Sequence, residues 1–313
     1  MLTLDVGIPE KRLYGIDLEP AKIEAWEAIS DSITEAEYAP PGLHAISCFL
    51  EKPWVKIALT LSLIAIACWF FPGALTFVSS FLLQPLRWVT LSIQKIFSMI
   101  PGVDLFTTTG PPLLQLTAGA FLLIAGIFTS PNFSKGAAAN TLSIISPPLV
   151  LERFIIIITG FLLNPKLYGT EELGTPLVAN SYQSMILGMI FAATVTIPFV
   201  EEGFFRWFIP LFYETVVTKI GNAIENLTDT DYTKETEWVI KKTNCIFSSV
   251  LFGALHFQND HLFSFTQALY CGWSAVRIMH PVMEAEGLEG SIAEHMMNNT
   301  VAVAPLVLSH ALS

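Results

Sequence analysis

Long apolar segments follow one another from about residue 54 to the C-terminus, whereas the first fifty or so residues are mixed and polar. A helix that crosses a bilayer needs about 20 mainly apolar residues. Segments of that kind are expected near residues 54–83, 112–130, 144–163, 182–217, 243–258, 262–280 and 291–312. The pattern predicts an all-α protein, a polytopic membrane bundle with six to eight transmembrane helices.

Two stretches leave the number of spans open. Pro72 and Gly73 interrupt the first apolar segment, which is therefore either one kinked helix or two shorter ones. Residues 84–105 are amphipathic and fit a helix in the membrane interface. Residues 219–242 form the longest polar stretch and are expected to be a loop between two spans. We divide the chain into an extramembrane N-terminal segment, a first group of transmembrane helices and a C-terminal transmembrane core, at residues 1–52, 53–179 and 180–313.

Composition supports a membrane protein. Charged residues make up 14% of the chain and hydrophobic residues 52%, whereas soluble domains carry about 25% charged residues. The net charge of −11 makes nucleic acid an unsuitable partner, so the expected partners are membrane lipid and a membrane-associated protein or peptide. Lysine and arginine concentrate on the side of the N-terminus, which predicts a cytoplasmic N-terminus, in the inner (plasma) membrane if the protein is bacterial.

Ionisable side chains occur inside several of the predicted spans, where each costs about 2.5–3.5 kcal/mol on insertion scales. Glu202 and Arg206 are four residues apart and can pair on one helix face, while Glu201 points about 100° away. The spans at 243–258 and 291–312 contribute further pairs with the same spacing, Phe252 with His256 and His295 with Asn299.

These side chains, brought together in a dry cavity, would suit hydrolysis. Glu201 can take a proton from water with the help of His256. His295 and Asn299 can donate hydrogen bonds to the oxyanion that forms on a scissile carbonyl. A buried ion-pair cluster without catalytic activity, joined by hydrogen bonds between helices, is the alternative that spacing alone leaves open.

A metal site is a further alternative. Glu201, His256 and His295 would be the ligands if the activity depended on zinc. The sequence contains no HExxH motif and no pair of histidines four residues apart, so the spacing does not favour zinc and no cofactor is expected.

Three short motifs, in this order, resemble the CPBP family of intramembrane proteases, which includes CAAX prenyl endopeptidases and bacteriocin-processing proteins. EExxxR is present as Glu201 to Arg206, FxxxH as Phe252 to His256, and HxxxN as His295 to Asn299. Each motif is weak alone, but three in order on apolar segments are a specific signal. The resemblance covers about residues 180–305.

The resemblance implies a helical-bundle endopeptidase that cleaves a peptide bond of a membrane-associated or prenylated protein. It implies Glu201 as the base that activates water, His256 as its helper, and a pair, Glu202 and Arg206, that holds the first motif in shape. It also implies His295 and Asn299 as the oxyanion donors. Trp207 stands where many members have glycine, and this bulky residue is expected to narrow the site and restrict prenylated substrates.

Two functions of other classes remain. A non-catalytic membrane scaffold or immunity factor with the same fold would retain the helices without the activity. A proton- or ion-coupled transporter would also use charged residues inside the membrane, but it predicts inverted repeats, which the sequence does not show.

Overall fold

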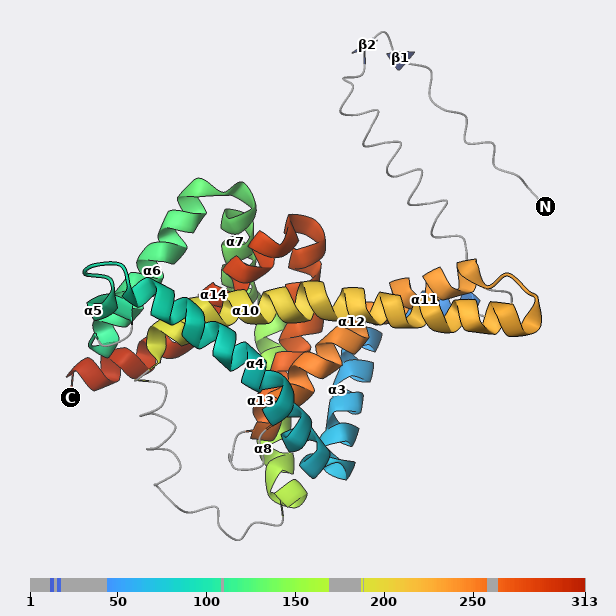
Figure 1. The fold of residues 1–313 in the computed structure, drawn as a ribbon, viewed down its shortest axis with the longest axis horizontal. Coiled ribbons are helices and arrows are strands. Elements are labelled where there is room, and N and C mark those ends of the chain that lie inside the picture. The colour runs from blue at the N-terminus through green and yellow to red at the C-terminus, as the bar shows by residue number, and fades with distance from the viewer. Residues whose placement is uncertain are drawn as a thin grey trace. The chain divides into compact units, whose positions relative to one another are not determined.

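The computed structural model describes residues 12–13, 16–17, 44–107, 110–168, 187, 189–257 and 264–312. The chain separates into two compact units, Met1–Cys48 and Phe49–Ser313. In the first unit, strands β1 (Arg12–Leu13) and β2 (Ile16–Asp17) pair antiparallel. The other described elements are helices, as predicted (Figure 1).

Proline begins most helices of the first half of the second unit. After α2 (His44–Leu50), the helices are α3 (Pro53–Phe70), α4 (Pro72–Ser98), α5 (Asp104–Thr107), α6 (Pro112–Thr129), α7 (Pro131–Ile145) and α8 (Pro147–Tyr168). Proline suits the first turn of a helix, where an N–H has no partner in the helix. The apolar segment at 54–83 is therefore two helices, which meet at Phe71 with a non-helical φ of −131° and ψ of 40°.

Three π-helical segments interrupt the C-terminal helices. The elements in order are η1 (Ala192–Thr196), α10 (Ile197–Glu202), η2 (Gly203–Phe208), α11 (Ile209–Thr228), α12 (Thr233–Leu255), α13 (Ser264–Ser274), η3 (Ala275–Met279) and α14 (His280–Leu312). The residue after each π segment bonds a carbonyl five residues earlier. A proline follows that residue each time, at Pro198, Pro210 and Pro281. Proline lacks an N–H and its ring clashes with the carbonyl of the preceding turn, so a locally wider turn accommodates it.

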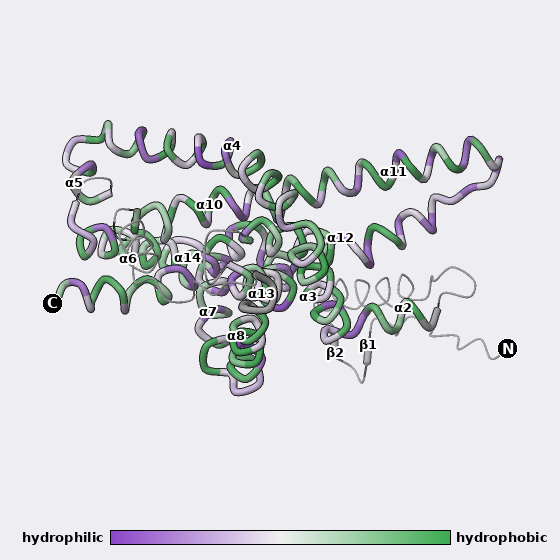
Figure 2. The backbone as a smooth tube through the Cα atoms, turned by 90° about the horizontal axis from the view of Figure 1, so that it is seen from below, coloured by the Kyte–Doolittle hydropathy of each residue, from purple (hydrophilic) through white to green (hydrophobic). Residues whose placement is uncertain are grey.

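Residues 190–228 are helical throughout, and Figure 1 shows α10 and α11 as one long ribbon. The helix continues into the region expected to be a loop, so the loop prediction for residues 219–242 was wrong. Only residues 229–232 lie between α11 and α12, and Asp229 ends α11 in the left-handed conformation with φ of 54°. Apolar residues such as Ile220 and Ile224 recur at helical spacing among polar ones, as the alternating colours of α11 in Figure 2 show.

Length and composition identify two described helices that could cross a membrane, α3 and α6. The pair α7 and α8, bent by 72°, makes a third if it counts as one span. The helix formed by α10 and η2 carries three charged residues between positions 201 and 206, unlike an entirely apolar transmembrane helix. The number of six to eight spans remains a prediction. Residues 182–186, 188, 258 and 262–263, which belong to three of the expected spans, lie outside the described residues, as does most of the expected N-terminal segment 1–52.

Helices α7 and α14 approach so closely that side chains do not fit between them. A Cβ atom built on Gly136 would lie 2.0 Å from the carbonyl oxygen of Gly290. Gly287, with φ of 70° and ψ of −171°, kinks α14 just before this contact, in a conformation that favours glycine. The kink and the contact together set the position of the part of α14 that carries the third motif.

We expect Gly136→Ala to destabilise the protein by about 1–3 kcal/mol, because two backbones would have to separate. Gly73→Ala is the matched control, since a Cβ there meets nothing within 4 Å. Thermal unfolding in detergent measures both effects. Equal unfolding temperatures for the two variants would contradict the packing described here.

Candidate active site

Four helical elements, α10, η2, α12 and α14, bring the motif residues together. Helix α10 ends with Glu201 and Glu202, and η2 follows with Arg206. His256 lies directly after α12, and α14 carries His295 and Asn299. Helix α10 contacts α14, and η2 contacts both α12 and α14.

The carboxylate of Glu201 lies between the two histidines. Its Oε1 atom is 3.9 Å from Nε2 of His256, and its Oε2 atom is 3.8 Å from Nε2 of His295. These separations are longer than a direct hydrogen bond, which is about 2.7–3.2 Å for nitrogen and oxygen. All three side chains are partly or largely shielded from solvent, Glu201 being 14% exposed and His256 18%.

The other ring nitrogen of each histidine is already bonded. Nδ1 of His256 lies 2.6 Å from the carbonyl oxygen of Phe252. A carbonyl only accepts hydrogen bonds, so Nδ1 carries the hydrogen and the neutral ring leaves a lone pair on Nε2. Nδ1 of His295 lies 2.9 Å from Oε1 of Glu202, and an ionised carboxylate also requires the hydrogen on Nδ1. Both Nε2 atoms therefore face Glu201.

Glu202 joins the three parts of the site. It is fully buried, and its Oε2 atom lies 3.5 Å from Nε of Arg206 and accepts a hydrogen bond from Ser291. Its Oε1 atom holds His295. The predicted pairing of Glu202 with Arg206 is present, but the carboxylate also orients a histidine on another helix. Buried charges require such partners, because an ionised carboxylate loses its hydration inside the protein.

Phe252 packs between the charged residues and the histidines. The guanidinium carbon of Arg206 lies 4.7 Å from the centre of the Phe252 ring. The same ring makes edge contacts with His256 at 4.6 Å and His295 at 6.0 Å, measured between ring centroids. Phe252 thus limits where all three side chains can move, and attraction between the cation and the ring adds to this packing.

Asn299 is bonded to a backbone carbonyl on η1. Its Nδ2 atom donates to the carbonyl oxygen of Ala193 at 2.8 Å. Its Oδ1 atom accepts from Nδ2 of Asn298 at 3.4 Å. Asn298 in turn accepts from the hydroxyl of Tyr270 at 3.1 Å. The second hydrogen on Nδ2 of Asn299 is not used by these bonds.

Sequence reasoning missed several side chains around the site. Ser291 stands four residues before His295, so the helical spacing used for the motifs could have found it. Ser248 donates to the carbonyl oxygen of Phe205 and lies 3.5 Å from Nη1 of Arg206. Glu294 is fully buried, next to His295, and accepts from Nδ2 of Asn140 at 2.7 Å. Only the fold shows these last contacts, because their partners lie on other helices.

No group of three His, Cys, Asp or Glu side chains in the described part of the chain has the geometry of a metal site. The ligands of the zinc alternative would be Glu201, His256 and His295. In a tetrahedral zinc site, donor atoms about 2.0–2.2 Å from the metal lie about 3.4 Å from each other, and the separations here are 3.8 and 3.9 Å.

Trp207 does not narrow the site. Its side chain is 61% exposed, on the outer surface of η2, whereas the preceding residue, Arg206, is buried. Neighbouring residues of a helix point about 100° apart, which explains the difference. The expectation that Trp207 narrows the site was therefore wrong, and the restriction of prenylated substrates stays a prediction.

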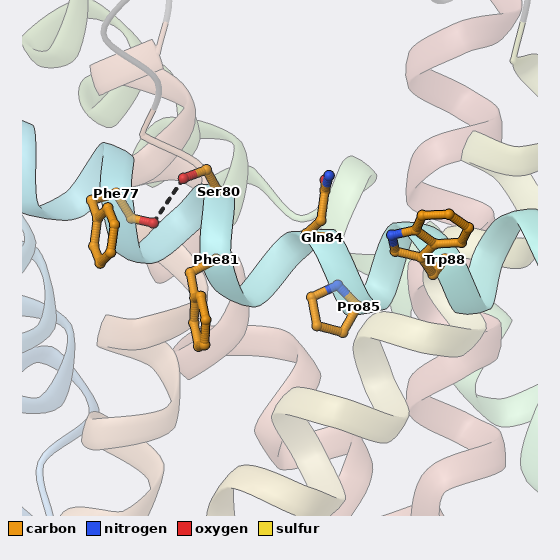
Figure 3. A pocket seen from close by; sticks show the side chains of 6 residues that line it. All are labelled: Phe77, Ser80, Phe81, Gln84, Pro85 and Trp88. Carbon is orange, nitrogen blue, oxygen red and sulfur yellow. Dashed lines mark hydrogen bonds between the residues drawn. The ribbon is translucent and has the colours of Figure 1, made fainter.

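A hollow of about 520 Å³ lies along one face of α4. Figure 3 shows its lining, which is Phe77, Ser80, Phe81, Gln84, Pro85 and Trp88. All of these residues belong to α4, and none of them belongs to a motif.

Comparison with known protein families gives one match. Residues 183–301 match the model of a family described as type II CAAX prenyl endopeptidase Rce1-like. The matched range contains all three motifs, from Glu201 to Asn299. No curated protein and no solved structure matches the chain.

Proposed function

Because residues 183–301 belong to the type II CAAX prenyl endopeptidase Rce1-like family, a protease family, we propose that the chain is an intramembrane endopeptidase. Its substrate is a membrane-associated or prenylated protein, in which it hydrolyses one peptide bond. The observation that carries this proposal is the carboxylate of Glu201, which lies within 4 Å of Nε2 of both His256 and His295.

Glu201 is suited to activate water. The lone pair on Nε2 of His256 can accept a hydrogen bond from a water molecule that also bonds Glu201. Glu201 removes one proton while the water oxygen bonds to the carbonyl carbon, and the electron pair of the C=O bond moves to the oxygen. General-base catalysis of this kind contributes about 10²–10⁴-fold. Glu201 then returns the proton to the amide nitrogen as the C–N bond breaks.

The negative oxygen formed in this step needs hydrogen-bond donors. Nε2 of His295 can donate when the ring is an imidazolium, since Nδ1–H is engaged with Glu202. The carboxylates of Glu201 and Glu202 flank this ring and favour its positive charge. The free hydrogen on Nδ2 of Asn299 is the second donor. In a site from which water is excluded, one such donor lowers the activation free energy by about 2.7–4 kcal/mol. Two donors therefore lower it by several kcal/mol.

The mechanism proposed here uses no metal. The experiment that tests the function uses the purified full chain and matched peptides, prenylated and unprenylated, with and without a chelator. We expect cleavage that persists in the chelator. Activity that disappears with chelator and returns with Zn²⁺ would instead support a zinc site at Glu201, His256 and His295. If no peptide is cleaved and motif variants behave like the wild type in cells, the chain is a non-catalytic scaffold or immunity factor.

We propose the finer membrane topology on the same basis, with six to eight spans and a cytoplasmic N-terminus, in the plasma membrane if the chain is bacterial. With seven spans, the turn between α11 and α12 faces the cytoplasm, in agreement with the lysines of this hairpin. A cysteine introduced at Thr230, which is exposed, should react with an impermeant maleimide only from the cytoplasmic side. Labelling from the opposite side would reverse the orientation.

A further inference from the structure

The carbonyl oxygen of Ala193 lacks a donor in its own helix. The N–H of Ile197 bonds the carbonyl of Ala192, five residues earlier. By the same pattern the next residue would bond Ala193, but that residue is Pro198, which has no N–H. A buried carbonyl without a donor costs free energy, so another group must satisfy it.

Asn299 supplies the missing donor from α14, through Nδ2 at 2.8 Å. Because a carbonyl can only accept, this contact decides which atom of the carboxamide is nitrogen and which is oxygen. The bonds from Asn298 to Oδ1 of Asn299 and from Tyr270 to Asn298 agree with that orientation. The anchored carboxamide keeps one N–H for another acceptor.

A second proline acts in the same way beside the site. The N–H of Ile209 bonds Phe204, and Pro210 leaves the carbonyl of Phe205 without a helical donor. Ser248 on α12 donates to that carbonyl. Two of the three π segments thus expose a carbonyl that a side chain on another helix binds. At the third π segment the N–H of His280 bonds Ala275, so Pro281 leaves the carbonyl of Val276 without a helical donor. Among the described residues, no motif side chain donates a hydrogen bond to that carbonyl.

We propose that Pro198 is a positioning residue for Asn299. By withholding an N–H it turns the carbonyl of Ala193 into an anchor, which fixes the carboxamide with one N–H free for the oxyanion of the substrate. The hydrogen bond between Asn299 and the Ala193 carbonyl does not depend on what the protein does, whereas its effect on catalysis rests on the proposed function. Two measurements separate the two parts.

The first measurement is a double-mutant cycle in thermal stability, with no activity assay. Asn299→Ala leaves the Ala193 carbonyl without a donor, so we expect Tm to fall by about 2–4 °C. In the Pro198→Ala background the alanine N–H satisfies the carbonyl, and the same change should shift Tm by less than about 1 °C. Equal losses in both backgrounds would overturn the anchor.

Asn299→Asp examines the same bond without touching the proline, and so covers the case in which Pro198→Ala does not accumulate. An ionised carboxylate cannot donate to a carbonyl, so Tm should fall at least as far as with Asn299→Ala. A Tm equal to that of the wild type would also overturn the anchor.

The second measurement repeats the double-mutant cycle of Pro198→Ala and Asn299→Ala, with kcat and KM of peptide cleavage in place of Tm. We expect Pro198→Ala to lower kcat about tenfold with KM unchanged, because the carboxamide loses its fixed direction. Combined with Asn299→Ala it should cause no further loss, and additive losses would refute a positioning role. Pro281→Ala, the matched control, makes the same chemical change at η3 and should leave kcat unchanged. If Asn299→Ala is fully active, the proposed role of Asn299 in catalysis fails, while the cycle in Tm still decides the anchor.

Discussion

Glu201→Gln is expected to lower kcat/KM for peptide cleavage by about 10²–10⁴-fold, the contribution of a general base. The substitution keeps the size of the side chain and removes its ability to take a proton. Among the described residues, the ion pairs of the Glu201 carboxylate are with the two histidine Nε2 atoms, at 3.8 and 3.9 Å, beyond the length of a hydrogen bond. The loss should therefore appear in kcat while the unfolding temperature remains that of the wild type.

The control for this prediction is Glu214→Gln. Glu214 lies on α11, is exposed and belongs to no motif, so the same chemical change there should leave cleavage unaffected. A Glu201→Gln variant that cleaves as fast as Glu214→Gln would show that another group activates the water.

Arg206→Met is expected to destabilise the protein by about 3–5 kcal/mol, the range for breaking a buried ion pair by removing one partner. The guanidinium lies 3.5 Å from Glu202, and both side chains are fully buried. Methionine replaces the volume but leaves the Glu202 carboxylate with less positive charge around it. Urea unfolding in mild detergent measures the effect as a lower midpoint.

The double variant Glu202→Met with Arg206→Met separates stability from activity. With both charges removed, much of the lost stability should return, because apolar residues often replace a buried pair without loss. Cleavage should not return, because His295 has lost the carboxylate that holds its Nδ1. A double variant less stable than Arg206→Met alone would contradict this account of Glu202.

Helical spacing within one segment predicted the pairing of Glu202 with Arg206, and the shared face of Phe252 and His256, from sequence alone. Spacing cannot show which helices meet. The bond between Glu202 and His295, 2.9 Å long, joins residues 93 positions apart. For that reason Glu202 was expected only to brace the first motif, and its bond to His295 was missed.

Hydropathy along the sequence predicted helices less well outside the most apolar segments. Helix α7 contains small and polar residues, so hydropathy did not mark it, yet it packs on α14 through Gly136. Residues 219–228 of the expected loop are helical because apolar residues recur along one face of α11, which a count of polar residues does not reveal. The three prolines after the π segments are visible in the sequence, but their effect on Ala193 and Phe205 required the coordinates.

The most direct test of the central claim is the cleavage rate of one membrane-anchored peptide by the purified full chain in lipid vesicles, measured with a chelator present. Glu201→Gln is measured beside the wild type in the same preparation. We expect cleavage by the wild type and none above background by the variant. Equal rates for the two proteins would contradict the role of Glu201, and a wild type that is inactive only in the chelator would contradict the metal-free mechanism.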